Sequence, residues 1–415
     1  MGDSTLRVAV VADFAEERWP SMDLVADSLF DRLCDEEANK ISAVLVRPRF
    51  KWRFSRAVRD DECNGPSGSS FNLDRLLNRF IDYPGHLQRL RDNFDVFHIT
   101  DHSYAHLVHY VAKGRAIVTC HDLDAFRVAL EPRAKAGPVN EAATVPRGRW
   151  LVGPPLRLIA ARQLRGLQCA AIVGCDSDAT RDELLQHRLV AADRTVTVHN
   201  GVAEGFSPQP DPEADLEAVR RLGPIGANTL EILHVGSTIP RKRIDVLLRV
   251  FAAIREANPS ARLVRAGGPF TTDQANLARE LNVEDAIVIL PFVTTKLLAA
   301  IYRRAALVLV TSEREGFGLP LIEAMACGAP VLASDLAVLR EVGGATSRFA
   351  PVGDVPEFAA IAQSLIRERI DDPASWNRRR TDALAHAATF TWSEYARRYA
   401  ELYRQVAAEA AQSST

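Results

Sequence analysis

Two glutamates with seven residues between them stand around a glycine-rich turn. Glu315 precedes the turn, and Glu323 lies one turn inside the apolar segment that follows Pro320. A proline in the first turn of a helix loses no hydrogen bond, because the first N–H groups of a helix are unpaired. These N–H groups and the helix dipole favour an anion such as a phosphate. The spacing therefore predicts an anion site at a helix start, with two carboxylates that contact different parts of one ligand. The alternative is a capped helix with two solvated glutamates, which a short glycine-rich turn by itself favours.

A cluster of cations follows a second glycine turn. An apolar segment at 231–235 leads into Gly236-Ser-Thr-Ile-Pro-Arg241-Lys242-Arg243. A glycine lets a ligand approach the backbone, and charge-assisted hydrogen bonds from Arg and Lys to phosphate are roughly twice as strong as neutral ones. Gly267-Gly268-Pro269 follows the segment 262–266 in a similar way. The alternatives are solvated surface charge and a plain strand-to-helix turn.

Histidines are the candidate chemical groups of the first half of the chain. His121 and Asp122 follow an apolar segment, where a helix-capping turn is the alternative to a functional site. His102, His106 and His109 have the spacing of one helix face, which could bind a metal but more often packs against a core. In that case His102, at the helix start, would face a ligand.

An aspartate pair raises the question of a metal. Asp176-Ser-Asp178 has the D-x-D spacing found in metal-dependent enzymes, but it precedes the helix-forming segment Ala179-Thr-Arg-Asp-Glu-Leu. Asp and Ser are favoured at helix starts because their side chains accept hydrogen bonds from free N–H groups. We expect a helix cap, and neither a metal nor another cofactor.

Short apolar segments alternate with amphipathic ones, which is typical of parallel sheets covered by helices. The first half has predicted strands at 6–11, 41–46, 96–99, 116–119, 171–173 and 195–199. The second half has them at 231–235, 262–266, 287–290, 307–310, 331–333 and 348–350. Predicted helices include 24–33, 181–186, 244–257, 272–281, 296–304 and 320–326. The pattern indicates two doubly wound α/β domains.

A proline-rich acidic segment, Pro208-Gln-Pro-Asp-Pro-Glu, indicates a linker between these domains. The predicted divisions are 1–207, a linker at 208–228, 229–388, and a terminal segment at 389–415 with an amphipathic helix at 393–409.

Composition limits the class of protein. The 415 residues are 47% hydrophobic and 25% charged, which suits two domains with sizeable cores. A net charge of −2 argues against a nucleic-acid binder. The cysteines at positions 34, 63, 120, 169, 175 and 327 show no C-x-x-C spacing, and the sequence has neither a basic-then-apolar leader nor an apolar run that could span a bilayer. We expect a reduced, cytoplasmic setting, with any membrane contact peripheral to the inner face of the membrane.

Two basic segments suit an anionic partner or an acidic membrane surface. Residues 38–59 carry seven Lys or Arg and no acid, interleaved with Phe50, Trp52 and Phe54. Residues 132–168 add seven more basic residues against one Glu. A solvated face is the alternative.

The segment 315–331, E-G-F-G-L-P-L-I-E-A-M-A-C-G-A-P-V, resembles the E-x7-E signature of the family 4 glycosyltransferases. The turns at 235–242, 266–269 and 200–202 resemble that family's V-G-x-x-x-P-R-K, G-x-G-P and N-G-V turns. The resemblance extends over most of the chain. It implies the GT-B fold, in which two doubly wound Rossmann-like domains face each other across a cleft and a C-terminal helix crosses back to the first domain.

The resemblance implies a retaining hexosyltransferase that moves a sugar from a UDP- or GDP-sugar to an acceptor hydroxyl without a metal. The first domain would bind the acceptor and the second the donor. Glu315 would contact the sugar and Glu323 the ribose. The implied catalytic residues are Glu315, His121, Lys242 and Arg241. The implied donor-binding residues are Gly236, Ser237, Arg241, Lys242, Gly267, Glu315, Gly316, Phe317, Gly318, Leu319 and Glu323, and the acceptor side has His102, His121 and Asp122.

The chain departs from the family pattern at three places. Ser237 stands where relatives carry an arginine, so part of the phosphate clamp is either missing or supplied by Arg241. His199 replaces a proline before the N-G-V turn. Residues 13–21 contain no glycine pair, which leaves acceptor binding open. The acceptor would be a sugar, a lipid-linked sugar or a phosphorylated small molecule.

Two other functions fit the same motifs. A sugar-nucleotide isomerase or a phosphorylase on this fold would turn over without an external sugar acceptor, or with free phosphate. A catalytically silent binding partner would more often have lost Glu315 or Lys242, and both are present.

Overall fold

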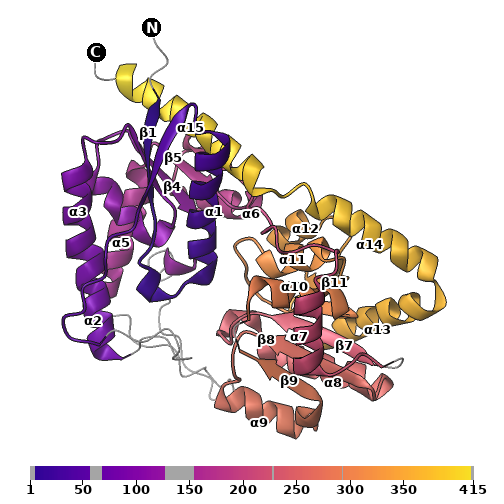
Figure 1. The fold of residues 1–415 in the computed structure, drawn as a ribbon. Helices are drawn as coiled ribbons and strands as arrows, with labels where there is room; N and C mark the ends of the chain where they lie inside the picture. Colours follow the sequence, from indigo (N-terminus) through magenta and orange to yellow (C-terminus); the bar gives the residue numbers. More distant parts are fainter. Residues whose placement is uncertain (1–4, 57–67, 127–153, 227–228, 292, 413–415) are drawn as a thin grey trace. The chain divides into compact units, whose positions relative to one another are not determined.

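The computed structural model describes residues 5–56, 68–126, 154–226, 229–291 and 293–412. The chain divides into two compact units, Met1–Asn200 with Trp392–Thr415, and Gly201–Thr391. Each unit contains a parallel sheet of six strands with helices on both faces (Figure 1). Because both faces are covered, the strands are nearly continuous apolar runs, which is the pattern that predicted them.

The first sheet has the strand order β2-β1-β3-β4-β5-β6. Its strands are β1 (Leu6–Val11), β2 (Ile41–Val46), β3 (Val96–Ile99), β4 (Ala116–Cys120), β5 (Ile172–Cys175) and β6 (Thr195–Thr197). All six predicted strands are confirmed, the first three with the predicted bounds. The order reverses between β1 and β3, so the loops after these strands lie where doubly wound sheets bind ligands.

Helices cover both faces of the first sheet. They are α1 (Pro20–Glu36), α2 (Ser69–Leu77), α3 (Tyr83–Leu90), α5 (Pro154–Cys169), α6 (Asp178–Gln186) and α15 (Trp392–Gln412), with the π-helical turn η2 (Asn78–Asp82) and the 3-10 segments η1 (Ala15–Glu17), η3 (His102–Tyr110), η4 (Asp124–Phe126) and η5 (Ala192–Arg194). On one face, Leu29 of α1 and Tyr399 of α15 share a core with Val10. On the other, Leu87 of α3 shares a core with Val11. Neighbouring residues of β1 thus serve different cores.

The last helix, α15, belongs to the first unit and is held there by a buried chain of hydrogen bonds. The Tyr403 hydroxyl lies 2.7 Å from His98 Nδ1, and His98 Nε2 lies 2.7 Å from Thr119 Oγ1. Thr119 Oγ1 lies 2.7 Å from the Tyr399 hydroxyl. Burial lowers the pKa of His98 to about 3, so the ring is neutral and can donate from one nitrogen and accept at the other. The C-terminal helix therefore packs on the first unit, as the resemblance implied.

The second sheet has the strand order β12-β11-β10-β7-β8-β9. Its strands are β7 (Leu230–Val235), β8 (Ala261–Ala266), β9 (Ile287–Leu290), β10 (Leu307–Val310), β11 (Val331–Ser334) and β12 (Arg348–Ala350). All six predicted strands are confirmed, and β9, β10 and β12 have the predicted bounds. The order reverses between β7 and β10, which brings the loops after these two strands to a second binding edge.

The second unit also carries helices on both faces of its sheet (Figure 1). They are α7 (Pro212–Leu222), α8 (Ile244–Ala257), α9 (Thr272–Glu280), α10 (Thr295–Arg304), α11 (Leu319–Ala326), α12 (Ala337–Gly343), α13 (Val355–Asp371) and α14 (Pro373–Ala387), with the 3-10 segments η6 (Pro240–Lys242) and η7 (Glu284–Ala286). Leu247 of α8 and Phe358 of α13 share a core with Leu263 of β8. The helix predicted at 244–257 has the predicted bounds.

The structure differs from the predicted linker at 208–228, because this segment contains α7. The Asp211 side chain accepts a hydrogen bond from the Ala214 N–H at 3.2 Å, and a proline in the first turn costs no hydrogen bond. Arg303 of α10 pairs with Asp215 of α7 at 2.6 Å. The second unit already begins at Gly201, so α7 is part of that unit.

Candidate active site

The two glycine turns of the second unit lie against each other at the carboxyl ends of β7 and β8. Gly236 donates its N–H to the Ala266 carbonyl oxygen at 2.9 Å. A Cβ on Gly267 would lie 2.1 Å from the Gly236 carbonyl oxygen, and φ of Gly267 is +129°. Only glycine fits at position 267, because a side chain would clash with backbone and disfavour this φ. The first turn continues through Ser237, which is partly exposed, into η6.

Lys242, Arg241 and Glu315 meet beside these turns. Lys242 Nζ lies 2.6 Å from Glu315 Oε1, and Arg241 Nη1 lies 3.6 Å from Glu315 Oε2. The Ser312 hydroxyl donates to Glu315 Oε1 at 2.7 Å. The two cations follow β7 and the glutamate follows β10, so the three side chains come together where the strand order reverses.

Glu315 is ionised although its side chain is only 6% exposed. Burial raises the pKa of the carboxyl group, but Lys242 and the Ser312 hydroxyl outweigh burial and hold the pKa below its usual range. Charge-assisted hydrogen bonds are shorter and stronger than neutral ones. The Glu315 carboxylate therefore fixes two cationic side chains at this edge of the sheet.

Helix α11 begins beside Glu315. Gly318 is its N-cap with φ of +101°, and a Cβ there would lie 2.7 Å from a Leu339 methyl carbon. Phe317 is 4% exposed, and its ring lies 5.9 Å from that of Phe390. The helix start that the sequence predicts is thus present, and packing on both sides fixes its turn.

Glu323 lies on α11 and is partly exposed. The Tyr302 hydroxyl donates to its Oε2 at 3.0 Å. Burial raises the pKa of the Glu323 carboxyl group to about 7, although the Tyr302 hydrogen bond opposes this rise. About half of these groups are therefore protonated at neutral pH. Glu323 can accept a hydrogen bond from a ligand hydroxyl if binding draws off this proton.

At the carboxyl edge of the first sheet, protein groups enclose His121. Its Nδ1 lies 2.6 Å from Asp176 Oδ2, and its Nε2 lies 2.7 Å from the Thr100 carbonyl oxygen. Asn200 also donates to Asp176 Oδ2, at 2.9 Å. Burial lowers the pKa of His121, but Asp176 outweighs burial and raises the pKa to about 9. The ring is an imidazolium with both N–H groups occupied, so one of these bonds must break before either nitrogen can contact a substrate.

The three-histidine stripe does not form a shared site. His102 Nδ1 accepts the His121 N–H at 3.2 Å, and His102 Nε2 lies 3.7 Å from Asp122 Oδ1. His106 is buried and hydrogen-bonds a backbone carbonyl oxygen, whereas His109 is exposed. The segment is a 3-10 helix with three residues per turn, so a spacing of four does not keep side chains on one face. The predicted shared face is therefore wrong.

The helix cap predicted at 176–178 is confirmed. The Ser177 hydroxyl accepts a hydrogen bond from the Thr180 N–H at 3.1 Å, and α6 begins at Asp178. In the part of the chain that the structure describes, no three His, Cys, Asp or Glu side chains meet as a metal site requires.

Bulky side chains fill the place where the family pattern has a glycine pair. Phe14 follows β1, is 1% exposed, and has its ring 5.4 Å from that of Phe50. The side chain of Glu17 is 1% exposed and pairs with Arg75 at 3.1 Å and with Arg79 at 3.6 Å. The loop after β1 is therefore filled by packed aromatic side chains and ion pairs, whereas a glycine pair would leave this place open.

The first basic segment is more buried than its composition predicts. Phe50 is buried and Trp52 is partly buried in the same core, whereas Phe54 is 58% exposed. Lys51 pairs with Asp82 at 2.7 Å. Of the three aromatic side chains interleaved with these cations, two therefore face the core of the first unit.

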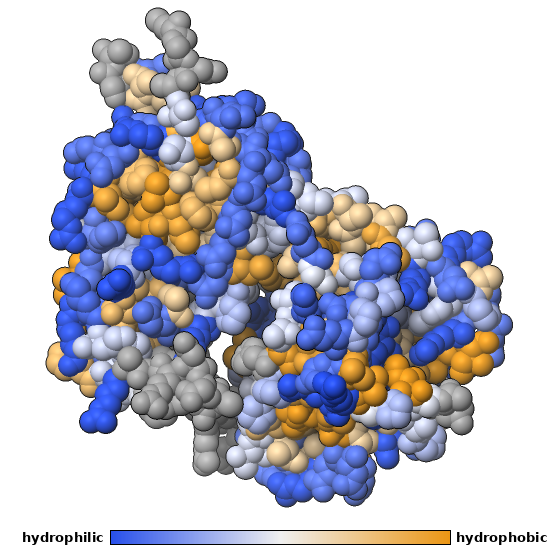
Figure 2. Space-filling view, in the orientation of Figure 1, coloured by the Kyte–Doolittle hydropathy of each residue, from blue (hydrophilic) through white to orange (hydrophobic). Residues whose placement is uncertain are grey.

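The surface of the described residues has both hydrophilic and hydrophobic areas (Figure 2). Figure 2 shows a mostly hydrophilic face with separate hydrophobic areas. None of the described helices combines the length and the apolarity that a membrane span requires. Residues 57–59 and 132–153 of the two basic segments lie outside the described residues.

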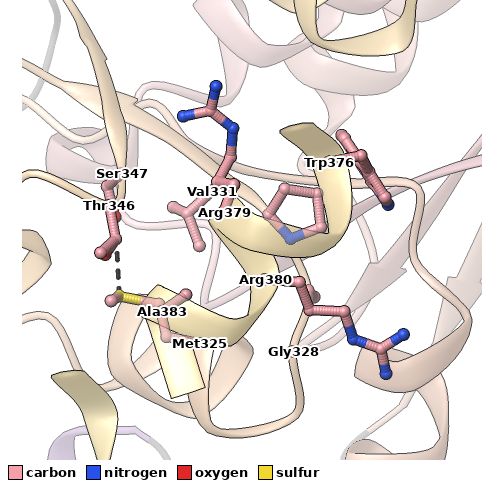
Figure 3. A pocket seen from close by; sticks show the side chains of 11 residues that line it. Met325, Gly328, Val331, Thr346, Ser347, Trp376, Arg379, Arg380 and Ala383 are labelled. Carbon is pink, nitrogen blue, oxygen red and sulfur yellow. Dashed lines mark hydrogen bonds between the residues drawn. The ribbon is translucent and has the colours of Figure 1, made fainter. Parts of the chain in front are cut away.

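A small pocket lies between the end of α11 and α14 (Figure 3). Met325, Gly328 and Trp376 are among its lining residues, and the Ser347 hydroxyl lies 3.6 Å from Met325 Sδ. Its volume of about 10 Å³ admits roughly one water molecule. A nucleotide does not fit there, so this pocket is a packing gap and not a donor site.

Sequence reasoning missed the roles of three residues that shape the site. Tyr302 donates a hydrogen bond to the glutamate on α11, and Asp176 holds the imidazolium in the first unit. Arg265 is fully buried and donates to a carbonyl oxygen of the first glycine turn at 3.0 Å. A cation inside the apolar segment before a glycine turn is a signal that could have revealed Arg265. No local pattern marks Tyr302, and the D-x-D pattern at Asp176 indicated a helix cap and not a partner of His121.

Two family models match the chain. Glycosyltransferase Family 4 matches residues 37–205, and Glycosyl transferases group 1 matches residues 217–381. One model thus covers most of the first unit and the other most of the second. The chain belongs to the family 4 glycosyltransferases. The E-x7-E segment and the glycine turn before the two cations lie inside the second match.

Curated relatives resemble this family 4 glycosyltransferase over part of its length. D-inositol 3-phosphate glycosyltransferase of Mycobacterium avium (strain 104) is 33% identical over 248 residues, which are 58% of this chain and 55% of that relative. The protein of the same name from Thermobispora bispora is 32% identical over 264 residues, 61% of this chain and 59% of that relative. The chain thus spans about half the length of the curated relatives it matches.

Solved structures share the fold. Sucrose-phosphate synthase from Thermosynechococcus elongatus superposes with a TM-score of 0.71 at 18% identity, over 97% of this chain and 100% of that one. Anabaena HepE in complex with UDP and glucose superposes with a TM-score of 0.67 at 16% identity, over 96% and 99%. At such identities the likeness shows the fold alone, which is the predicted GT-B fold.

Proposed function

We propose that this chain is a retaining glycosyltransferase that moves a sugar from a nucleoside diphosphate sugar to an acceptor hydroxyl. The observation that carries the proposal is the contact of Lys242 and Arg241 with Glu315, beside the start of α11, where the strand order of the second sheet reverses. Doubly wound folds bind nucleotides at such a reversal. Family membership supports the same reaction class.

The leaving diphosphate explains why cations are needed. When the bond from the sugar to the phosphate breaks, negative charge grows on the phosphate oxygens. Lys242, Arg241 and the start of α11 would stabilise that charge, and Glu315 would hold both cations in position before the donor arrives. These groups can replace a metal, so we propose that the reaction proceeds without one. The departing phosphate would take the proton of the attacking hydroxyl.

Glu323 would bind the ribose of the donor. Its carboxylate can accept hydrogen bonds from two neighbouring hydroxyls, and its raised pKa makes that binding depend on pH. The structure of Anabaena HepE contains UDP. We therefore take UDP as the first nucleotide to test, with GDP and ADP as the alternatives.

The acceptor would bind to the first unit, near His102, His121 and Asp122. The curated relatives are named for D-inositol 3-phosphate, so a phosphorylated polyol is the first acceptor to test. A sugar or a lipid-linked sugar is the alternative, and peripheral contact with a membrane surface belongs to that alternative.

Calorimetry of nucleotide binding tests this proposal. UDP, GDP and ADP are titrated into the wild type, Lys242→Ala and Glu323→Ala with EDTA present, and again with Mg²⁺. We expect one nucleotide to bind without Mg²⁺ and both variants to weaken it. Lys296→Ala is the matched control, because Lys296 is an exposed lysine of the same unit. If the wild type binds none of the three nucleotides, the chain is a silent partner and the proposal fails.

Transfer itself needs a second assay. Release of the nucleoside diphosphate from its sugar conjugate is measured with and without D-inositol 3-phosphate, and the anomeric configuration of the product is read by NMR. Turnover without any acceptor, or only with free phosphate, would indicate an isomerase or a phosphorylase instead.

A further inference from the structure

Arg265 is the largest fully buried side chain among the described residues. It lies in β8, two positions before the Gly267 turn, and pairs in register with His234 of β7. A Cβ on Gly236 would lie 3.5 Å from His234 Cε1 and 3.6 Å from Lys242 Cε, so both side chains lie at the turn after β7. Burial, Arg265 and Lys242 together lower the pKa of His234 to about 3. A neutral imidazole and a guanidinium thus lie side by side beneath the two glycine turns.

The contacts of Arg265 are with backbone oxygens of both turns. Its Nη2 donates to the Gly236 carbonyl oxygen at 3.0 Å, and its Nη1 donates to the Gly268 carbonyl oxygen. Its guanidinium carbon lies 5.2 Å from the centre of the Phe270 ring. One side chain therefore joins the turn after β7 to the turn after β8, at the place where the two backbones touch.

No carboxylate of a described residue forms an ion pair with Arg265, unlike Arg262 on the same strand, which pairs with Glu231. Burial lowers the pKa of Arg265 to about 10, so the side chain remains charged at neutral pH. Its Nε and the Nδ1 of His234 have no hydrogen-bond partner. A buried charge without a counterion costs free energy, and a side chain kept at that cost points to an anion that binds close by.

The backbone carbonyl oxygens of the two glycine turns also affect how an anion binds there. A carbonyl oxygen that faces a phosphate repels it, and a carbonyl oxygen that is hydrogen-bonded to a guanidinium is both turned away and neutralised. Arg265 does this for one carbonyl in each turn. The close approach of Gly267 to Gly236 means that neither turn can move without the other.

We propose that Arg265 is a positioning residue for the donor diphosphate: it locks the two glycine turns together and adds an uncompensated positive charge beneath them. This inference rests on the proposed function, because its ligand is the diphosphate of the donor. The donor diphosphate would then meet positive charge from two sources: Lys242 in the turn after β7, and Arg265 in strand β8.

Three variants separate the charge from the packing. Arg265→Lys keeps the charge and a donor, Arg265→Gln keeps a donor without charge, and Arg265→Met keeps neither. Arg262→Met is the matched control on the same strand, because its partner Glu231 retains the ion pair with Arg304. The dissociation constants of UDP and of uridine are measured for each protein, together with the free energy of unfolding in urea.

We expect the affinity for UDP to fall about tenfold or more in the Gln and Met variants, the size of effect of one partly screened charge. Uridine affinity should stay unchanged, and the Lys variant should keep most of the UDP affinity. The Met variant should unfold no more easily than the wild type, since it removes an unpaired buried charge. If the Gln variant fails to fold, the Lys and Met variants still give the comparison.

Two results would overturn the inference. Equal losses for UDP and uridine with a lower unfolding free energy would show a structural role only, and an unchanged UDP affinity in the Met variant would show no role. Failure of the proposed function is distinguishable from both, because then the wild type itself binds no nucleoside diphosphate, with GDP and ADP tested alongside UDP.

Discussion

The raised pKa of Glu323 predicts that nucleoside binding depends on pH. Burial raises the pKa of this carboxyl group from its usual 4.5 to about 7. The ionised fraction then falls from roughly nine tenths at pH 8 to roughly one tenth at pH 6. If the ribose hydroxyls donate to the carboxylate, only the ionised form binds well. The affinity should therefore fall about tenfold between pH 8 and pH 6, and binding at pH 6 should release about one proton.

The same shift has a consequence for the free protein. The raised pKa means that the folded state disfavours the charge, so the stabilisation is complete below the unfolded pKa and is lost as the pH rises through 7. The contribution is about 3 kcal/mol at 1.36 kcal/mol per pKa unit. A bound ribose that donates hydrogen bonds to the ionised carboxylate would offset part of this loss of stability.

Calorimetry in buffers of different ionisation enthalpy measures both the affinity and the protons released. Glu323→Gln keeps the shape without the titration, so its weaker affinity should not change with pH. Tyr302→Phe removes the hydrogen bond that opposes the shift, so the midpoint should move above that of the wild type. An affinity that is flat across this range in the wild type, or a slope that survives in Glu323→Gln, would refute the reasoning.

Three further predictions concern stability, each measured by urea unfolding. Gly267→Ala should destabilise the fold well beyond Gly268→Ala, because only the former adds a clash at 2.1 Å to a strain of about 1–3 kcal/mol at positive φ; equal losses would contradict this. The pKa of His121 is raised to about 9, so the stabilisation by its ion pair with Asp176 is complete below pH 6.5 and is lost as the pH rises through 9. This stabilisation is about 3 kcal/mol, and Asp176→Asn should abolish the dependence of the unfolding free energy on pH in this range. Tyr403→Phe should lower the free energy of unfolding by about 1–3 kcal/mol, because it leaves a buried imidazole nitrogen unpartnered; no loss would mean that water replaces the hydroxyl.

The strands were predictable because a parallel sheet covered on both faces needs apolar side chains on both sides, and this leaves uninterrupted apolar runs. The helix start at Pro320 was predictable for a local reason, since proline and glycine limit the backbone wherever they stand. The segment predicted as a linker contains a helix because Pro212 lies in the first helical turn, where a proline costs no hydrogen bond, and Asp211 before it is the helix cap.

Side-chain partners were beyond prediction where they depend on residues far apart in the sequence. His121 and Asp176 are 55 positions apart and meet only because β4 and β5 are neighbours in the sheet. The directions of Phe50 and Trp52 depend on the core they join, which their alternation with cations does not reveal. Arg265 could be seen as unusual in the sequence, but its role depends on two turns that the fold brings together.

The position of α15 sets the order in which the two units can form during synthesis. The second unit is one continuous segment, Gly201–Thr391, whereas the first also needs Trp392–Thr415, which is synthesised after that segment. Until then the nascent chain carries the imidazole of His98 and the hydroxyl of Thr119 without their tyrosine partners. The second unit can therefore complete its fold while the first unit is still incomplete and its uncovered core is accessible to chaperones and proteases. A nonsense mutation at the start of α15 would leave the second sheet intact and the first unit unfinished.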